Sequence, residues 1–142
     1  MMNNKDFDYL NELSGAIIGA AIEVHKEIGP GLLESAYEEC LKVELMSRGM
    51  HVETQVDLPL YYKGKPTGKT YRIDMLVNDE VILELKSVEL LKNVNEIQLV
   101  TYLKLANKKL GLLINFNEAV LKDGIRRKIN SDVVNVRSSH TD

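Results

Sequence analysis

The spacing of hydrophobic residues in this 142-residue chain changes near Gly49, and that change limits the possible folds more than any other feature. Before it, apolar residues recur at steps of three and four, which is typical of amphipathic helices. After it, segments rich in Val and Thr indicate strands. The helical pattern breaks once, at Gly29-Pro30-Gly31, so we expect two helices. The first carries Leu10, Leu13, Ile17, Ala20, Ala21, Val24 and Ile28, and the second carries Leu33, Ala36, Tyr37, Cys40 and Leu41 and ends near Arg48-Gly49.

The rest of the chain predicts three strands, one helix and a last strand. The strands are His51–Leu60, Tyr71–Val77, Val81–Lys86 and Lys109–Phe116, the helix is Val94–Ala106, and turns are expected at 63–69 and 78–80. The first three strands can pair antiparallel, and the last helix and strand then form a crossover unit. We therefore expect the α/β fold class, with a mixed central sheet flanked by helices.

Length and composition restrict the class of protein further. The length suits one domain, expected at 9–130 between a flexible N-terminal tail (1–8) and a C-terminal tail (131–142). The longest uncharged run, 13–22, is too short to span a bilayer, and the N-terminus lacks the apolar stretch of a signal peptide. The single cysteine, Cys40, excludes a disulfide framework. We expect a cytoplasmic protein without a membrane partner.

The charge balance argues against a dedicated high-affinity nucleic-acid binder. The net charge is -3, from 18 basic and 21 acidic residues, whereas such binders usually carry a basic excess. An enzyme that contacts nucleic acid weakly and transiently remains compatible with this balance. Two short basic groups could contact phosphate, Arg126-Arg127-Lys128 and the lysines of 63–69, although solvated surface is the simpler interpretation.

Charged residues interrupt two of the predicted strands at positions expected to be buried. Glu84 and Lys86 are two apart in an apolar strand and so share a face, and Asp74 interrupts the preceding strand. A two-residue turn would separate the two carboxylates onto opposite faces. A three-residue turn at 78–80 would place Asp74 directly opposite Glu84, and Asn78 and Asp79 suit such a turn because they tolerate positive φ.

Two explanations of these charges stay open. Lys86 could neutralise Glu84 in a structural ion pair, with Asp74 at the edge of its strand. Alternatively, Asp74 and Glu84 hold a cation between them, because two facing carboxylates repel unless one is protonated or a cation intervenes. Oxygen ligands of this kind select Mg²⁺ or Mn²⁺.

Two helices offer further candidates beside the sheet. Glu34 lies on the edge of the apolar stripe of the second helix, where it either approaches the metal or complements the helix dipole. Gln98 and Tyr102 are four apart and share a face of the third predicted helix. They form either a polar seam beside the core or a substrate-orienting pair.

The residues from about 17 to 130 resemble the GxxExxY protein family. Gly31-Leu32-Leu33-Glu34-Ser35-Ala36-Tyr37 matches its signature, and further matches are Ile22-Glu23-Val24-His25, Gly29-Pro30-Gly31, Tyr61-Tyr62-Lys63-Gly64, Glu84-Leu85-Lys86, Gln98 with Tyr102, and 111–116. That family is placed in the PD-(D/E)XK nuclease-like superfamily. The resemblance implies a restriction-endonuclease-like αβββαβ core, in agreement with the predicted order of elements.

The resemblance also implies roles for individual residues. Asp74, Glu84 and Lys86 correspond to the superfamily pattern, and Gln98-x-x-x-Tyr102 resembles the extra motif of its exonuclease-like branch. Glu34 corresponds to the acidic residue that the superfamily carries on a helix. The implied metal ligands are Asp74, Glu84, the Leu85 carbonyl and Glu34. Two positions depart from the pattern: Asn95 stands where the family commonly has His, and Ile73 replaces the proline before the first acidic residue.

The resemblance implies a metal-dependent phosphodiesterase, a nuclease acting on DNA or RNA with Mg²⁺ or Mn²⁺. Lys86 would orient the attacking water, help to deprotonate it and stabilise developing charge. The alternative is a catalytically inactive module on the same fold that binds nucleic acid or a protein partner, because fold does not determine function.

Overall fold

The computed structural model, which describes residues 4–131, is built around a five-stranded mixed sheet with strands in the order β1-β2-β3-β4-β5. The strands are β1 (Val52–Tyr62), β2 (Lys65–Val77), β3 (Val81–Lys86), β4 (Leu110–Asn115) and β5 (Ile125–Ile129). β3 and β4 run parallel, and the other neighbouring pairs run antiparallel. The predicted mixed sheet and α/β class are therefore confirmed.

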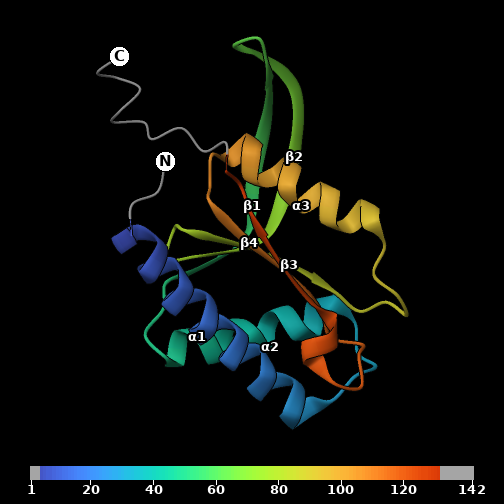
Figure 1. The fold of residues 1–142 in the computed structure, drawn as a ribbon. Helices are drawn as coiled ribbons and strands as arrows, with labels where there is room; N and C mark the ends of the chain where they lie inside the picture. The colour runs from blue at the N-terminus through green and yellow to red at the C-terminus, as the bar shows by residue number, and fades with distance from the viewer. Residues whose placement is uncertain (1–3, 132–142) are drawn as a thin grey trace.

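Helices cover both faces of this sheet (Figure 1). They are α1 (Asn4–Ile28), α2 (Glu34–Ser47) and α3 (Asn93–Ala106), and a short 3-10 helix, η1 (Leu121–Gly124), precedes β5. One apolar core lies between the sheet and the pair α1 and α2, and a second lies between the sheet and α3. α1 begins at Asn4, within the stretch 1–8 predicted as a tail, whereas the predicted tail 131–142 lies outside the described residues apart from Ser131.

The predictions for the strands were wrong in two places. The expected turn over 63–69 is a two-residue turn, Lys63-Gly64, and β1 and β2 continue on either side of it as a long hairpin. Both turn residues have positive φ, 51° and 78°, the geometry that joins strands by the shortest connection. β5 was not predicted, because Arg126, Arg127 and Lys128 interrupt its hydrophobic pattern. An edge strand tolerates such charges.

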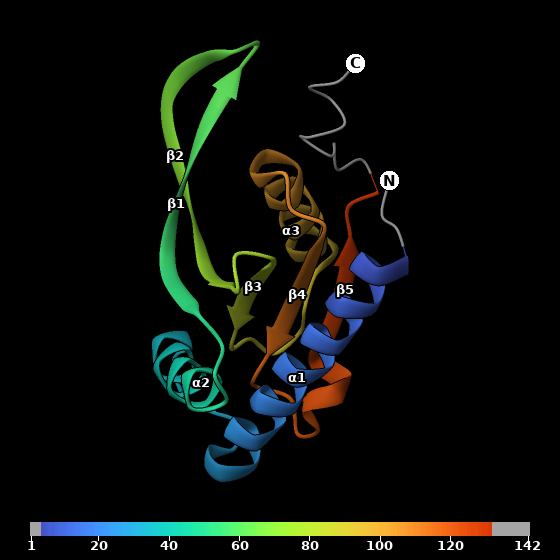
Figure 2. The same cartoon turned by 90° about the vertical axis from the view of Figure 1, so that its left-hand side faces the viewer.

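The hairpin of β1 and β2 extends past α3, away from the body of the protein (Figure 2). We call its outer part, residues 58–71, the hairpin arm. Its register shifts between Pro59 and Tyr61, with Gly68 at φ 85° in the longer segment of β2. Thr67 Oγ1 donates a hydrogen bond to the Leu60 carbonyl and so stabilises this bulge.

The strands β1 and β2 twist sharply where Gln55 faces Asp74. Residues two apart on a strand share a face, yet Met75 packs in the core beneath α1 and α2 whereas Ile73 packs in the core beneath α3. On β1, Val52 and Val56 divide between the same two cores. Gln55 has φ 53°, a left-handed conformation that few residues other than Gly adopt. This twist sets Asp74 at the junction between the two cores.

Candidate metal centre

The turn between β2 and β3 has three residues, Asn78 to Glu80, as the sequence predicts. Asn78 and Asp79 have φ of 51° and 57°, so the positive φ expected of them is confirmed. The register pairs Met75 with Leu83, which brings Asp74 and Glu84 level with one another at the next position.

Asp74 and Glu84 each take a hydrogen bond from the backbone of the other strand. The Asp74 amide donates to Glu84 Oε2 at 3.0 Å, and the Leu85 amide donates to Asp74 Oδ2 at 2.8 Å. These two bonds replace the backbone ladder, whose last pair is Met75 with Leu83. Each carboxylate uses one oxygen in this way and has a second oxygen beyond these bonds.

Burial and mutual repulsion perturb both carboxylates. Glu84 is 5% exposed, and its burial, reinforced by the charge of Asp74, raises its pKa to about 8. Burial also raises the pKa of Asp74, against the opposing effects of the Leu85 hydrogen bond and the Lys86 charge. A pair of this kind favours a shared proton or a cation over two free negative charges.

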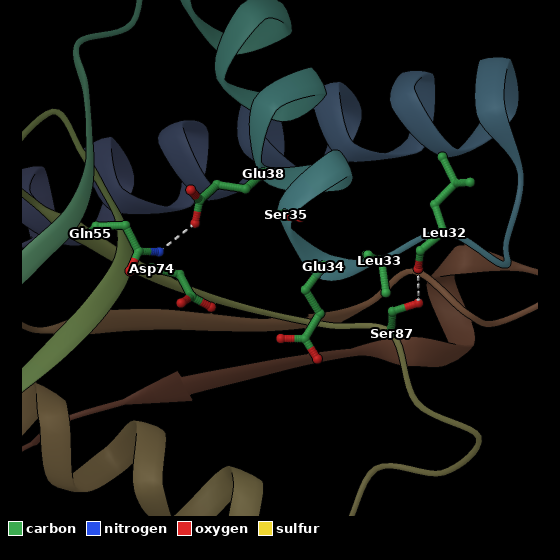
Figure 3. A pocket seen from close by; sticks show the side chains of 8 residues that line it. All are labelled: Leu32, Leu33, Glu34, Ser35, Glu38, Gln55, Asp74 and Ser87. Carbon is green, nitrogen blue, oxygen red and sulfur yellow. Dashed lines mark hydrogen bonds between the residues drawn. The ribbon is translucent and has the colours of Figure 1, made fainter.

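Asp74 opens into a pocket of about 590 Å³ between α2 and the sheet. Figure 3 shows Glu38, Gln55 and Asp74 lying together on one side of it, with Glu34 extending from the start of α2. Its other lining residues are Leu32, Leu33, Ser35 and Ser87. Three carboxylates thus line the pocket and Glu84 is buried beside Asp74, so a cation is favoured there over an anion.

Two residues of this pocket, Glu38 and Gln55, were not predicted from the sequence. Gln55 Nε2 donates a hydrogen bond to Glu38 Oε1 at 2.7 Å, and the Gln55 side chain also lowers the pKa of Asp74 through a hydrogen bond. Burial raises the pKa of Glu38, and the charge of Asp74 adds to that effect. Gln55 therefore links the carboxylate of Glu38 on α2 to that of Asp74 on β2. Gln55 reaches the pocket from a left-handed backbone, and no sequence pattern signals that conformation.

The loop before α2 determines where Glu34 lies. The Tyr37 hydroxyl donates to the Gly29 carbonyl at 2.6 Å and accepts from the Leu32 amide at 3.1 Å, while its ring stacks on Phe116 at 4.5 Å. Ser87 Oγ donates to the Leu32 carbonyl at 2.6 Å and ties the loop to the end of β3. The tyrosine of the Gly31-to-Tyr37 signature thus holds the backbone that presents Glu34, and Glu34 itself is exposed at the rim of the pocket.

Lys86 is half-buried at the end of β3 and does not form the ion pair considered above. Among residues 4–131, no ion pair joins it to Glu84 or Asp74, although its charge lowers the pKa of both. The chain beyond it is anchored by buried Asn115, which bonds the amide and the carbonyl of Val88 at 3.0 and 2.9 Å. Lys86 is thus close to the carboxylates and not bound to them.

The two residues expected on α3 both lie on that helix but differ in exposure. Tyr102 is 7% exposed, and its pKa is raised by burial and by the nearby charge of Glu84. Gln98, one turn earlier, is exposed. Asn95, at the position where the resembling family commonly has His, caps α3: its Oδ1 accepts a hydrogen bond from the Lys92 amide at 2.9 Å.

The comparisons with known proteins agree with this fold. The sequence profile of the PD-(D/E)XK nuclease superfamily matches residues 11–128. Because this match covers most of the chain, the protein belongs to that superfamily, and its five-stranded mixed sheet flanked by helices agrees with the predicted restriction-endonuclease-like core. Searches of curated proteins and of solved structures gave no match. None of the described helices is long and apolar enough to cross a membrane.

Proposed function

We propose that this protein is a metal-dependent phosphodiesterase of the GxxExxY branch, which hydrolyses the backbone of DNA or RNA. The observation that carries the proposal is the reciprocal pair Asp74 and Glu84, level on neighbouring strands beside an acidic pocket. Superfamily membership supports nuclease activity in general. The proposed domain is 9–130, and its proposed location is the cytoplasm.

The donor set fits Mg²⁺ or Mn²⁺. In the described part of the chain no three His, Cys, Asp or Glu side chains form a ready ligand group, and the reciprocal pair Asp74 and Glu84 supplies two carboxylates. Mg²⁺ suits such a site, because it usually keeps several waters and binds one or two carboxylates together with substrate phosphate. We assign Asp74, Glu84 and the Leu85 carbonyl as ligands, and Glu34 as a partner acting through water. When bound, the metal would supply Lewis acidity and a water of lowered pKa.

The neighbouring side chains provide the remaining functions. The Lys86 ammonium, which forms no ion pair with another residue of 4–131, would orient the attacking water, help to deprotonate it and stabilise negative charge on the phosphate. Tyr102, buried beside Glu84, positions the scissile phosphate. Gln98 is exposed one turn away, so its part in the proposal is contact with the substrate rather than with Lys86.

Cleavage assays with matched lysine variants test this proposal. Wild type should cleave labelled DNA or RNA with Mg²⁺ or Mn²⁺ and be inactive in EDTA. Lys86→Ala should lose about a hundredfold in rate, as expected when one group that stabilises transition-state charge is removed. Lys86→Arg should rescue poorly, because a guanidinium differs in shape and does not give up its proton. Lys104→Ala, an exposed lysine of α3, is the control and should keep the wild-type rate.

The same assay can reject the proposal. Equal rates for wild type and Lys86→Ala would indicate a contaminating nuclease. Equal rates, or no cleavage by either protein, would favour an inactive module that binds nucleic acid or a protein partner.

A further inference from the structure

The hairpin arm is basic although the protein as a whole is acidic. Residues 58–71 contain Lys63, Lys65 and Lys69 and no acidic residue, against a net charge of -3 for the chain. All three lysines are exposed, and none forms an ion pair with another residue of the described chain. Their charges are therefore available to a partner.

The second basic group of the sequence is not available in the same way. Glu96 of α3 accepts an ion pair from Lys128 at 2.6 Å and lies 3.9 Å from Arg126. Arg127 donates a hydrogen bond to Asn11 of α1. These contacts give 126–128 a role in holding β5 against its neighbours, so the hairpin arm is the better phosphate-binding surface.

Tyrosines and lysines lie next to one another along the arm. Tyr62 is paired with Lys65 across the hairpin, and Leu58 is paired with Tyr71; Leu58 and Tyr62, four apart on β1, share a face. The Lys63 ammonium lies 5.4 Å from the centre of the Tyr62 ring, and the Lys69 ammonium lies 5.6 Å from that of Tyr71. Tyr62 is 66% exposed, so its ring can accept a stacked group.

This row of side chains leads back to the candidate metal centre. The ring of Tyr71 lies 5.9 Å from that of Tyr102, and Tyr102 is close enough to Glu84 for the carboxylate charge to raise its pKa. Lys65 precedes Asp74 by nine residues of β2, which corresponds to roughly 25–30 Å of strand. A ligand following this row would extend from the tip of the arm to the carboxylates.

We infer that the hairpin arm binds single-stranded nucleic acid and guides it toward Asp74 and Glu84. The lysines neutralise phosphates, and the tyrosine rings stack on bases, a combination that suits single strands because their bases are unpaired. A duplex presents its phosphates but not its base faces, so it would leave the rings unused. This inference rests on the proposed function and adds the class of substrate.

Binding measured in EDTA tests the arm without requiring catalysis. The probes are fluorescent oligothymidylate and oligouridylate of about 15 nucleotides, within the site sizes of single-strand binders, and a DNA duplex hairpin. In low salt, Lys63→Ala/Lys65→Ala/Lys69→Ala should bind the single strands at least about tenfold more weakly, with a salt slope lower by about 2. The matched control is Lys26→Ala/Lys42→Ala/Lys122→Ala, which removes the same charge away from the arm and should bind as wild type does.

Tyr62 distinguishes stacking from charge. Tyr62→Ala should weaken single-strand binding roughly tenfold, within the range for loss of one stacked base, while leaving duplex binding unchanged. Tyr62→Phe keeps the ring and should restore single-strand binding. Because Tyr62 is exposed and belongs to neither core, these substitutions should leave the fold intact, which circular dichroism can verify.

Several outcomes would overturn the inference. Equal binding by the two triple variants would show that the arm does not bind single strands. Tighter binding of duplex than of single strands, unchanged in Tyr62→Ala, would make the arm a contact for duplex. A change of oligomeric state in the arm variants without loss of oligonucleotide binding would instead make the arm a contact between copies of the chain. Failure of the proposed function is distinct: the arm variants would still lose binding, but no cleavage dependent on Lys86 would appear in Mn²⁺.

Discussion

At the scale of single residues, the most informative group is the Glu84 carboxyl. It is buried beside a second carboxylate and takes its hydrogen bond from the Asp74 amide rather than from a cationic side chain. Acidic side chains are rarely buried without a cationic partner, and a buried carboxyl whose pKa is raised beside another charge is typical of functional sites. Without metal, the folded protein therefore holds a proton on this group that the unfolded chain would release.

This proton predicts how stability depends on pH. The pKa of Glu84 is about 8 in the folded protein against 4.5 for the ordinary carboxyl, so between these values the folded state binds more protons than the unfolded state. The free energy of unfolding should fall as pH rises through this range and level off above it. Each pKa unit is worth about 1.4 kcal/mol, so the decline should amount to a few kcal/mol. Urea unfolding in EDTA at successive pH values measures it.

Glu84→Gln is the decisive variant for that measurement. It keeps the shape of the side chain and removes the titration, so its stability should vary much less over the same pH range. Glu12→Gln, at an exposed glutamate of α1, should keep the wild-type slope. An equally steep decline in Glu84→Gln would assign the pH dependence to other groups.

At the scale of elements, β1 and β2 carry the bend on which the site depends. Gln55 and Asp74 face each other where the two strands pass from one core to the other, and the left-handed backbone of Gln55 makes this passage possible. A residue with a Cβ atom loses about 1–2 kcal/mol in that conformation. Strain of this kind is common at functional sites and is maintained by the packing around it.

The strained backbone at Gln55 predicts that glycine is the more stable of the Gly and Ala substitutions at Gln55 but the less stable of the two at Thr54. Gln55→Gly and Gln55→Ala both lose the hydrogen bond to Glu38, but only glycine relieves the backbone, so the glycine variant should be more stable by about 1 kcal/mol. At Thr54, where φ is not positive, glycine should be the less stable of the same two substitutions by about 0.5–1 kcal/mol. Urea unfolding of the four variants gives both differences. The same sign at both positions would refute a strained backbone at Gln55.

The elements also show which parts of the fold can be predicted from sequence. The turn after β2 was predictable because Asn78 and Asp79 tolerate positive φ. The length of this turn determines that Asp74 lies opposite Glu84. The length of the hairpin was not predictable, because Lys, Pro and Gly between Lys63 and Lys69 resemble a loop and only cross-strand pairing makes them strand. Tertiary contacts likewise place Gln55 and Glu38 in the pocket. Asp74, Glu84 and Lys86, in contrast, could be predicted as site residues from their spacing in two apolar strands.

At the scale of the whole molecule, the acidic pocket couples metal binding to folding. The carboxylates repel one another in the folded protein, and a bound cation would remove that repulsion. Mn²⁺ should therefore raise the melting temperature, by about 3 °C for each kcal/mol of binding free energy gained. The increase should be greater at pH 8 than at pH 6, because the metal displaces the proton held on Glu84.

Differential scanning calorimetry of three proteins measures this coupling. Wild type and Glu12→Gln should show the same increase with Mn²⁺, and Glu84→Gln should show none. An unchanged increase in Glu84→Gln would place the metal outside the proposed site. Ca²⁺, a larger cation that takes more oxygen ligands than two carboxylates and a carbonyl provide, should give a smaller increase than Mn²⁺.

The alternation of side chains along the hairpin arm has a consequence for how such a protein can diverge. The bend at Gln55 and Asp74 and the turn at Asn78 fix the strands at their inner end, so the outer end is free to change in length without moving the carboxylates. One residue added to each strand would turn the tyrosines and lysines beyond it onto the opposite face, whereas two would leave them in line. Related proteins could then differ in arm length by steps of about 7 Å without reorienting these side chains. An intermediate length would need a new arrangement of tyrosines and lysines along the arm.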